Sequence, residues 1–149
     1  MSTIVIQDDY MGASWAVSSL MQEHYNEVTT LKSLMKLNPD WARFEKLEEL
    51  GKLLSLTAWV DGDPAGYSIN VVDNHPHYAD LLVVQNDILF VAERHRNSSL
   101  GLKLIKRTEE LARSSGAKLM LWHAKPDTAL AKILQRRSRV QDIVFANEL

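Results

Sequence analysis

The sequence contains no cysteine, and this absence excludes several kinds of site. Without cysteine there is no disulfide framework, no thiolate nucleophile and no cysteine-based zinc site. A reducing, cytoplasmic setting fits this composition, and we expect it for the protein. No apolar run approaches the length of a membrane span, so no membrane association is expected. The first ten residues lack a basic region followed by an apolar stretch, so we expect no signal peptide.

The sequence also lacks an excess of either charge. It has 17 basic and 19 acidic side chains, which give a net charge of -2 and argue against broad electrostatic binding to nucleic acid. Its 149 residues, 46% of them hydrophobic, predict one globular domain over residues 1–149. The basic residues do gather in two stretches, 94–107 and 132–139. Each stretch is either a solvated helix face or a local site for a polyanionic ligand.

The first third of the sequence has a helical pattern. Apolar residues recur every three or four positions from Val17 to Met35 and predict one amphipathic helix, which stops at Asn38 and Pro39. Asp40 then caps a second, short helix over residues 41–50. His24 lies on the apolar stripe, where we expect a half-buried, hydrogen-bonded histidine.

The pattern then changes to that of strands. Apolar and β-branched residues predict three strands joined by turn sequences, at residues 53–60, 66–72 and 78–91. The polar residues 85–87 interrupt the third strand, which indicates a bulge or bend. These strands are expected to form an antiparallel meander.

The second half alternates between helix and strand. Helices are predicted over residues 98–114 and 128–137, and strands over 118–122 and 142–146. This order places parallel strands beside the meander. The predicted fold class is α+β (mixed α/β): one central mixed sheet, with an antiparallel meander and then βαβαβ, flanked by helices.

The segment from Asp87 to Gly101 has the most informative pattern: a strand, a tight polar turn and a helix start. A helix N-terminus offers unpaired backbone N–H groups to an anion. Small side chains allow a phosphate to approach, and cations can neutralise it; the segment supplies Ser98, Ser99, Gly101, Arg94, Arg96 and Lys103. The alternative interpretation is an ordinary strand-to-helix connection in which the serines are caps.

This segment resembles motif A of the GNAT superfamily of N-acetyltransferases. That motif is a hydrophobic strand, then Arg/Gln-x-x-Gly-x-Gly/Ala, then a helix, and it corresponds here to Arg96-Asn97-Ser98-Ser99-Leu100-Gly101. The order of elements is similar from Leu53 to Phe145. His77-Tyr78 and Trp122-His123-x-Lys125 resemble the small phage-type members. The resemblance implies transfer of an acetyl group from acetyl-CoA to a primary amine.

The resemblance also implies how acetyl-CoA is held. The long strand would splay from the strand at 118–122, and the pantetheine arm would pair with backbone groups of Leu89, Phe90 and Val91. Backbone N–H groups of Asn97, Ser98, Ser99, Leu100 and Gly101 would hold the pyrophosphate, with Arg94, Arg96 and Lys103 nearby. A backbone N–H near Phe90 or Val91 would polarise the thioester carbonyl.

An amine must lose a proton before it can attack, so a base is needed. Asp87, in the polar break of the long strand, is the first candidate; Glu93, His77 and His123 follow. Tyr78 is the nearest tyrosine that could protonate the leaving sulfur, although a thiolate can leave without an acid. The alternative for Asp87 is a bulge residue bonded to its own backbone.

Two departures from the family pattern support a second hypothesis. Ser99 replaces the first motif glycine, and residues 133–136 lack the tyrosine that many members carry in the last helix. The chain could therefore be a binding module that holds CoA, or nothing, and contacts a partner protein. A third hypothesis is action on a nucleic-acid base, against which the net negative charge weighs.

Other site types receive little support. His75 and His77 supply two possible metal ligands without a third fixed by the sequence, so a turn is favoured and no metal is expected. Neither a Gly-x-Ser-x-Gly elbow nor a Walker loop is present. The amine pocket is expected between the two N-terminal helices and the turn at 75–77. Residues 142–146 form a possible edge for a homodimer.

Overall fold

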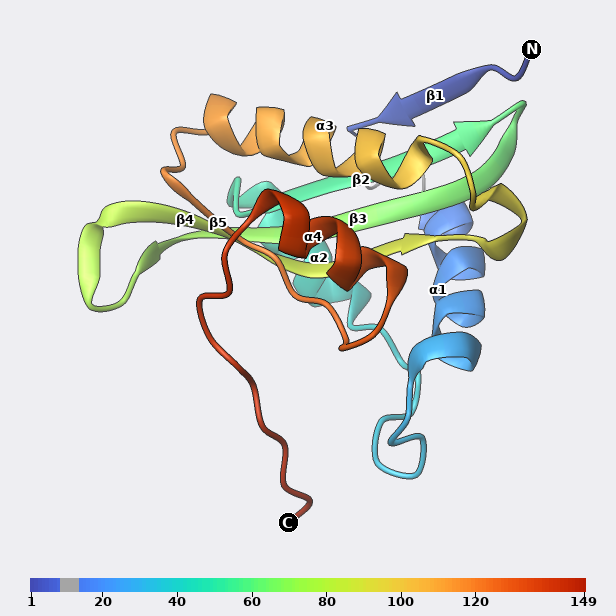
Figure 1. Ribbon diagram of the computed structural model, residues 1–149. Coiled ribbons are helices and arrows are strands. Elements are labelled where there is room, and N and C mark those ends of the chain that lie inside the picture. Colours follow the sequence, from blue (N-terminus) through green and yellow to red (C-terminus); the bar gives the residue numbers. More distant parts are fainter. Residues whose placement is uncertain (9–13) are drawn as a thin grey trace.

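The computed structural model describes residues 1–8 and 14–149 (Figure 1). Its elements, in chain order, are β1 (Ile4–Gln7), α1 (Ser14–Val28), α2 (Trp41–Glu49), β2 (Leu53–Val60), β3 (Asp63–His75), β4 (Tyr78–Val91), the 3₁₀ turn η2 (Glu93–His95), α3 (Leu100–Ser114), β5 (Leu119–Leu121) and α4 (Ala129–Arg137). No helix among the described residues is long and apolar enough to cross a membrane.

The described strands form one mixed sheet in the order β1-β2-β3-β4-β5. The first four pair in antiparallel fashion, and β4 pairs with β5 in parallel through the crossover helix α3. The predicted mixed sheet, with its meander and flanking helices, is therefore confirmed.

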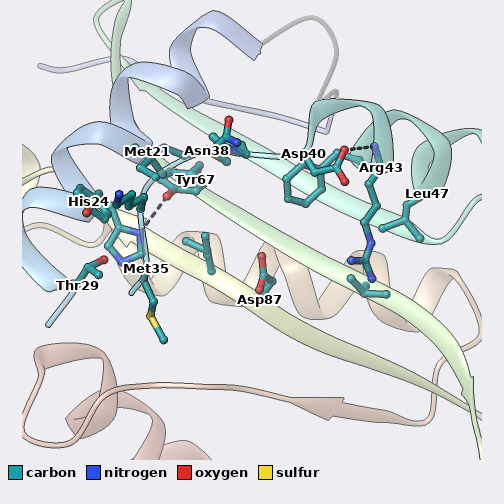
Figure 2. A pocket seen from close by; sticks show the side chains of 17 residues that line it. Met21, His24, Thr29, Met35, Asn38, Asp40, Arg43, Leu47, Tyr67 and Asp87 are labelled. Carbon is teal, nitrogen blue, oxygen red and sulfur yellow. Dashed lines mark hydrogen bonds between the residues drawn. The ribbon is translucent and has the colours of Figure 1, made fainter. Parts of the chain in front are cut away.

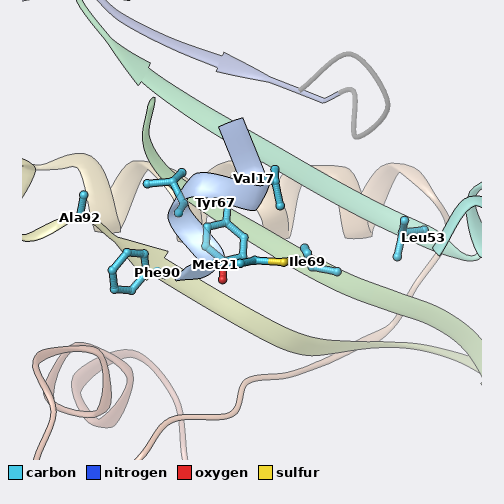
Figure 3. Close-up of a cluster of buried hydrophobic side chains, with 8 residues drawn as sticks. Val17, Met21, Leu53, Tyr67, Ile69, Phe90 and Ala92 are labelled. Carbon is cyan, nitrogen blue, oxygen red and sulfur yellow. The ribbon is translucent and has the colours of Figure 1, made fainter. Parts of the chain in front are cut away.

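Helices cover both faces of the sheet. On one face, Val17 and Met21 of α1 pack against Tyr67, Ile69 and Phe90 (Figure 3). On the other face, Leu100 and Leu104 of α3 pack against Leu56, Ala58 and Ala65. Successive strand residues point to opposite faces, so each strand supplies both cores.

Gly66 allows α3 to approach the sheet closely. A Cβ atom at this position would lie 2.8 Å from the Phe90 carbonyl oxygen and 3.1 Å from Leu104 Cδ1. Any larger residue would push α3 and β4 away from β3. The segment that resembles motif A lies on β4 and α3. The close contact at Gly66 therefore sets the positions of these two elements relative to β3.

The predicted bulge in the long strand is present. Ile69 pairs with Ile88 and Asn70 with Asn86, so Asp87 is the extra residue of β4. The buried Asn86 amide nitrogen donates to Asn70 Oδ1 at 2.9 Å and to the Ile88 carbonyl at 3.1 Å. These hydrogen bonds hold the bulge in one conformation and satisfy the Asn86 amide nitrogen, while the buried Asn86 Oδ1 has no partner among the described residues.

The strands β4 and β5 pair over a short distance only. The register runs from Val83 with Leu119 to Gln85 with Leu121, after which β5 ends while β4 continues to Val91. His123 Nδ1 donates to the Asn86 carbonyl over 2.5 Å at the point where the strands part. Among the described residues, one edge of β4 beyond Asn86 therefore has no neighbouring strand, an arrangement similar to the splay that the resemblance implied.

The N-terminal elements differ from the sequence prediction. The helix predicted to reach Met35 ends at Val28, whose carbonyl accepts a hydrogen bond from Lys125 Nζ at 2.5 Å. The β-branched Thr29 and Thr30 follow, which disfavours further helix. The strand β1 was not predicted: only four residues long, it pairs with β2 through Ile4 and Ile6, which pack beneath α3.

The predicted last strand is also wrong for the single chain. Residues 138–149 form neither helix nor strand, and Val140, Ile143, Val144 and Phe145 are 70–85% exposed. β-branched and aromatic composition favours a strand only where a neighbouring strand supplies hydrogen bonds.

Candidate active site

A pocket of about 530 Å³ lies on the face of the sheet that α1 and α2 cover (Figure 2). Its walls come from α1, the segment 29–40, α2, β3 and the bulge of β4. Met21, His24 and Tyr25 line it from α1, and Asp87 and Ile88 from β4. Both N-terminal helices therefore line this pocket. The turn at 75–77 does not line it.

The bulge places Asp87 in this pocket, and a smaller hollow beside it is lined by Asp87 and His123. The Asp87 side chain is open to water through the pocket mouth, but the protein around the carboxyl group limits its hydration. This desolvation raises the pKa of Asp87 above its ordinary value, while the nearby His123 acts in the opposite direction. A raised pKa makes the carboxylate a stronger proton acceptor.

His24 lines the pocket from α1. Its Nδ1 is 3.0 Å from the Tyr67 hydroxyl, and its ring stacks on Phe90 at 4.8 Å between centroids. Burial is the main cause of its lowered pKa; Lys125 and Arg96 lower it further and Glu27 opposes them. The expected half-buried, hydrogen-bonded histidine is confirmed. Its place in the pocket was not expected, because the α1 stripe indicated only a core contact.

The free edge of β4 offers backbone groups to a ligand. Ala92 N–H donates to Ala65 O at 2.9 Å, and the Phe90 carbonyl also faces β3. Since strand residues alternate, Leu89 and Val91 direct their backbone groups to the open side. The Val91 carbonyl accepts from Arg96 Nε at 2.9 Å, which leaves the N–H groups of Leu89 and Val91 on that side.

The turn after β4 ends in the N-terminus of α3. Asn97 has a left-handed backbone with φ of 61°, and Leu100 N–H donates to Ser98 Oγ at 3.3 Å. Within the described residues, the N–H groups of Gly101 and Leu102 have no partner. A Cβ atom on Gly101 would meet only Val91 Cγ2, at 3.9 Å. The fold therefore does not require glycine here, whereas a ligand close to the backbone would.

Both arginines that were predicted to bind phosphate have carboxylate partners. Arg94 pairs with Glu23 at 2.9 Å and Asp63 at 2.8 Å; Arg96 pairs with Glu27 at 2.6 Å. The hydrogen bond from Arg96 holds the pKa of Glu27 below its usual range. These pairs fasten α1 to the turn. These pairs could not be predicted from local sequence patterns, because the partners lie 31 to 71 residues apart.

The remaining predicted residues lie elsewhere. Lys103 is exposed on α3 and has no ion-pair partner among residues 1–8 and 14–149. Glu93 is exposed in η2 and lines neither hollow. At the far end of β4, the Tyr78 ring is tilted against the His75 ring, with 4.7 Å between the ring centroids. Tyr78 comes nine positions before Asp87, about 30 Å along an extended strand, and it does not line the pocket.

The sequence and the fold were compared with those of known proteins. The sequence matches the acetyltransferase (GNAT) family over residues 18–137. No curated protein matches the chain at significant similarity.

Several solved structures share the fold. One is the ribosomal-protein-alanine N-acetyltransferase from Brucella melitensis biovar Abortus 2308, with 16% identity, a TM-score of 0.76 and 99% coverage of each chain. Another is the aminoglycoside N-acetyltransferase AAC(6')-Iy in complex with CoA, with 18% identity, a TM-score of 0.70 and coverage of 99% of this chain and 96% of that one. A third, a transcriptional regulator from Bacillus halodurans C-125, has 13% identity, a TM-score of 0.77 and coverage of 99% and 100%.

The family match spans most of the chain, and the sheet, the splayed strands and the helix N-terminus agree with it. The chain belongs to the acetyltransferase (GNAT) family. By class it is an acyltransferase with acetyl-CoA as cosubstrate.

Proposed function

We propose that the protein transfers the acetyl group of acetyl-CoA to the nitrogen of a primary amine. The observation that carries this proposal is that consecutive residues of β4 border both the pocket and the free edge of the strand. Asp87 and Ile88 line the pocket on the α1 and α2 face, and Leu89 and Val91 turn their backbone groups to the splayed edge. An acceptor and a thioester could therefore meet on adjacent residues of one strand.

The cosubstrate would lie along the free edge of β4. The N–H groups of Leu89 and Val91 suit the amides of the pantetheine arm, as an added strand would pair with them. The turn from Asn97 to Gly101 suits the pyrophosphate, because it ends in unpaired N–H groups at the positive end of α3. Lys103 is the first cation along α3, and it has no carboxylate partner in the part of the chain that the structure describes. Arg94 and Arg96 would contribute by holding the turn against α1.

Asp87 would serve as the base. The neutral amine attacks the thioester carbonyl, a carbon–nitrogen bond forms, the carbon–sulfur bond breaks and CoA leaves as the thiolate. Asp87 takes the proton that the amine loses, and its raised pKa suits it to this role. No tyrosine occurs in α4, and a thiolate can leave without an acid.

Asp87→Asn tests this role in an assay of CoA release over a broad panel of primary amines. We expect kcat to fall by about 100-fold or more, the usual contribution of a general base. Acetyl-CoA binding should be unchanged, because the side chain lies on the acceptor face. In the native enzyme, kcat/KM should fall on acidification through the raised pKa of Asp87, at a higher pH than for an ordinary aspartate. Native turnover by the Asn variant would exclude Asp87 as the base.

A second candidate is a binding module that contacts a partner protein. Two observations favour it: α4 has no tyrosine, and the segment 140–145 exposes Val140, Ile143, Val144 and Phe145. Exposed apolar segments of this kind are buried in interfaces. Acetyl-CoA turnover with any amine would exclude a purely binding role.

We make three further proposals, on assembly, location and kinship. Pairing of the segment 142–146 between two copies would form a homodimer and cover its apolar side chains. A cytoplasmic location fits the absence of cysteine. Kinship with the small phage-type acetyltransferases rests on His77-Tyr78 and Trp122-His123-x-Lys125 alone.

A further inference from the structure

We infer that the acceptor is a primary amine on an apolar body that carries no second positive charge. This inference rests on the proposed function and names the substrate class of the same pocket. It follows from two features of the lining: an apolar wall and charged groups of which as many are positive as negative.

The wall of the pocket is largely apolar. Met21, Met35, Leu37, Phe44, Leu47 and Ile88 all line it. Met35 and Leu37 are 53% and 38% exposed, although both are apolar. Covering such side chains with an apolar ligand removes their surface from water, which favours binding. The wall therefore fits a hydrocarbon or aromatic body better than a sugar.

The charges that line the pocket disfavour a polycation. Among the described residues its carboxylates are Asp40 and Asp87, and its cations are Lys36 and Arg43. Asp40 accepts a hydrogen bond from the Arg43 backbone N–H at 3.0 Å and caps α2, so one of its oxygens is held at the helix N-terminus.

Neither Lys36 nor Arg43 has an ion-pair partner in the described part of the chain. With Asp87 beside the reacting amine, Asp40 is the carboxylate that remains in the lining for a second ammonium group. A second ammonium group would have to lie near the unpaired cations, where like charges repel.

The experiment compares kcat/KM for two series of amines with saturating acetyl-CoA. One series contains monoamines with alkyl or aryl bodies, such as 2-phenylethylamine. The other contains polyamines, such as spermidine and an aminoglycoside. We expect the best monoamine to exceed the best polyamine by about tenfold or more, equivalent to about 1.4 kcal/mol.

Two variants of α2 show whether the pocket charge sets this preference. Arg43→Glu reverses a charge that lines the pocket, and glutamate at this helix position can cap α2 together with Asp40, so the variant should fold. We expect it to reduce the preference for monoamines. Lys46→Glu reverses a charge on the same helix that does not line the pocket, and it should leave the preference unchanged.

The outcomes separate the inference from the function beneath it. A polyamine that is acetylated as well as the best monoamine would overturn the inference while the proposed acetyl transfer stands. An equal response of Arg43→Glu and Lys46→Glu would also overturn it. Acetyl-CoA binding without acetylation of any amine would instead contradict the proposed function itself.

Discussion

The two sides of β4 are built differently. On the cofactor side, comprising the free edge of β4, residues 92–101 and α3, the helix is anchored by Leu100, Leu104 and Ile105, which are fully buried. On the acceptor side, comprising α1, residues 29–40 and α2, the connecting segment has no helix or strand, and Leu34 and Met35 are more than half exposed. The proposed site for acetyl-CoA therefore lies on well-packed core elements, whereas the proposed acceptor site lies on a loosely packed segment.

The two sides are nevertheless fastened together. The ion pairs of Glu23 with Arg94 and of Glu27 with Arg96 join α1 to the turn that precedes α3. Because α1 carries His24, these contacts set the position of one pocket wall relative to the proposed phosphate site. Arg94 and Arg96, which were predicted from the sequence to bind phosphate, thus join α1 to the turn before α3.

The largest expected difference between the sides concerns stability. Leu104→Ala removes a fully buried side chain beneath α3 and should lower the free energy of unfolding by about 2–5 kcal/mol. Met35→Ala, on the exposed wall of the pocket, should change it by about 0.5 kcal/mol or less. Urea denaturation of both variants measures this. Equal losses would contradict the contrast between a packed and a loose side.

Substitution of Gly101 should have a smaller effect on stability, and it should change stability and acetyl-CoA binding in opposite directions. Gly101→Ala should raise the free energy of unfolding by up to about 0.5–1 kcal/mol, since alanine favours a helix and the Cβ atom has room. The same methyl group should weaken acetyl-CoA binding if the pyrophosphate lies against this backbone. Thermal melting and a binding titration provide the two measurements. Unchanged binding would mean that no ligand approaches here.

The weakest expected effect is at the contact between the two sides. Glu27→Gln should lower the free energy of unfolding by roughly 0.2–1 kcal/mol, because the pair with Arg96 is partly exposed and screened by salt.

The pH dependence of this contribution follows from the lowered pKa of Glu27. The contribution is present above the unfolded-state pKa and is lost as the pH falls through the lower folded-state value. Native protein and variant should therefore converge in stability in strong acid. A difference that persists there, or that grows with added salt, would show that the pair is not its cause.

Local sequence patterns correctly predicted the elements that depend on interactions between residues close in sequence. The meander, the helix α3 and the bulge at Asp87 follow from the periodicity and from a polar break in an apolar strand. Contacts distant in sequence determined the rest. Lys125 bonds to the carbonyl at the end of α1, and a strand predicted over residues 142–146 has no neighbour in one chain. Tyr78, close to the motif in sequence, is carried away from it by the length of β4.

Calorimetric titration with acetyl-CoA tests the assignment of the cofactor side most directly. Native protein should bind one molecule per chain. Gly101→Glu, which places a bulky anion at the N-terminus of α3, should bind at least about 100-fold more weakly, a loss of about 2.7 kcal/mol. Lys106→Glu, an exposed charge reversal further along α3, should bind nearly as the native protein does. No binding by the native protein, or equal binding by Gly101→Glu, would contradict a cosubstrate site at this turn.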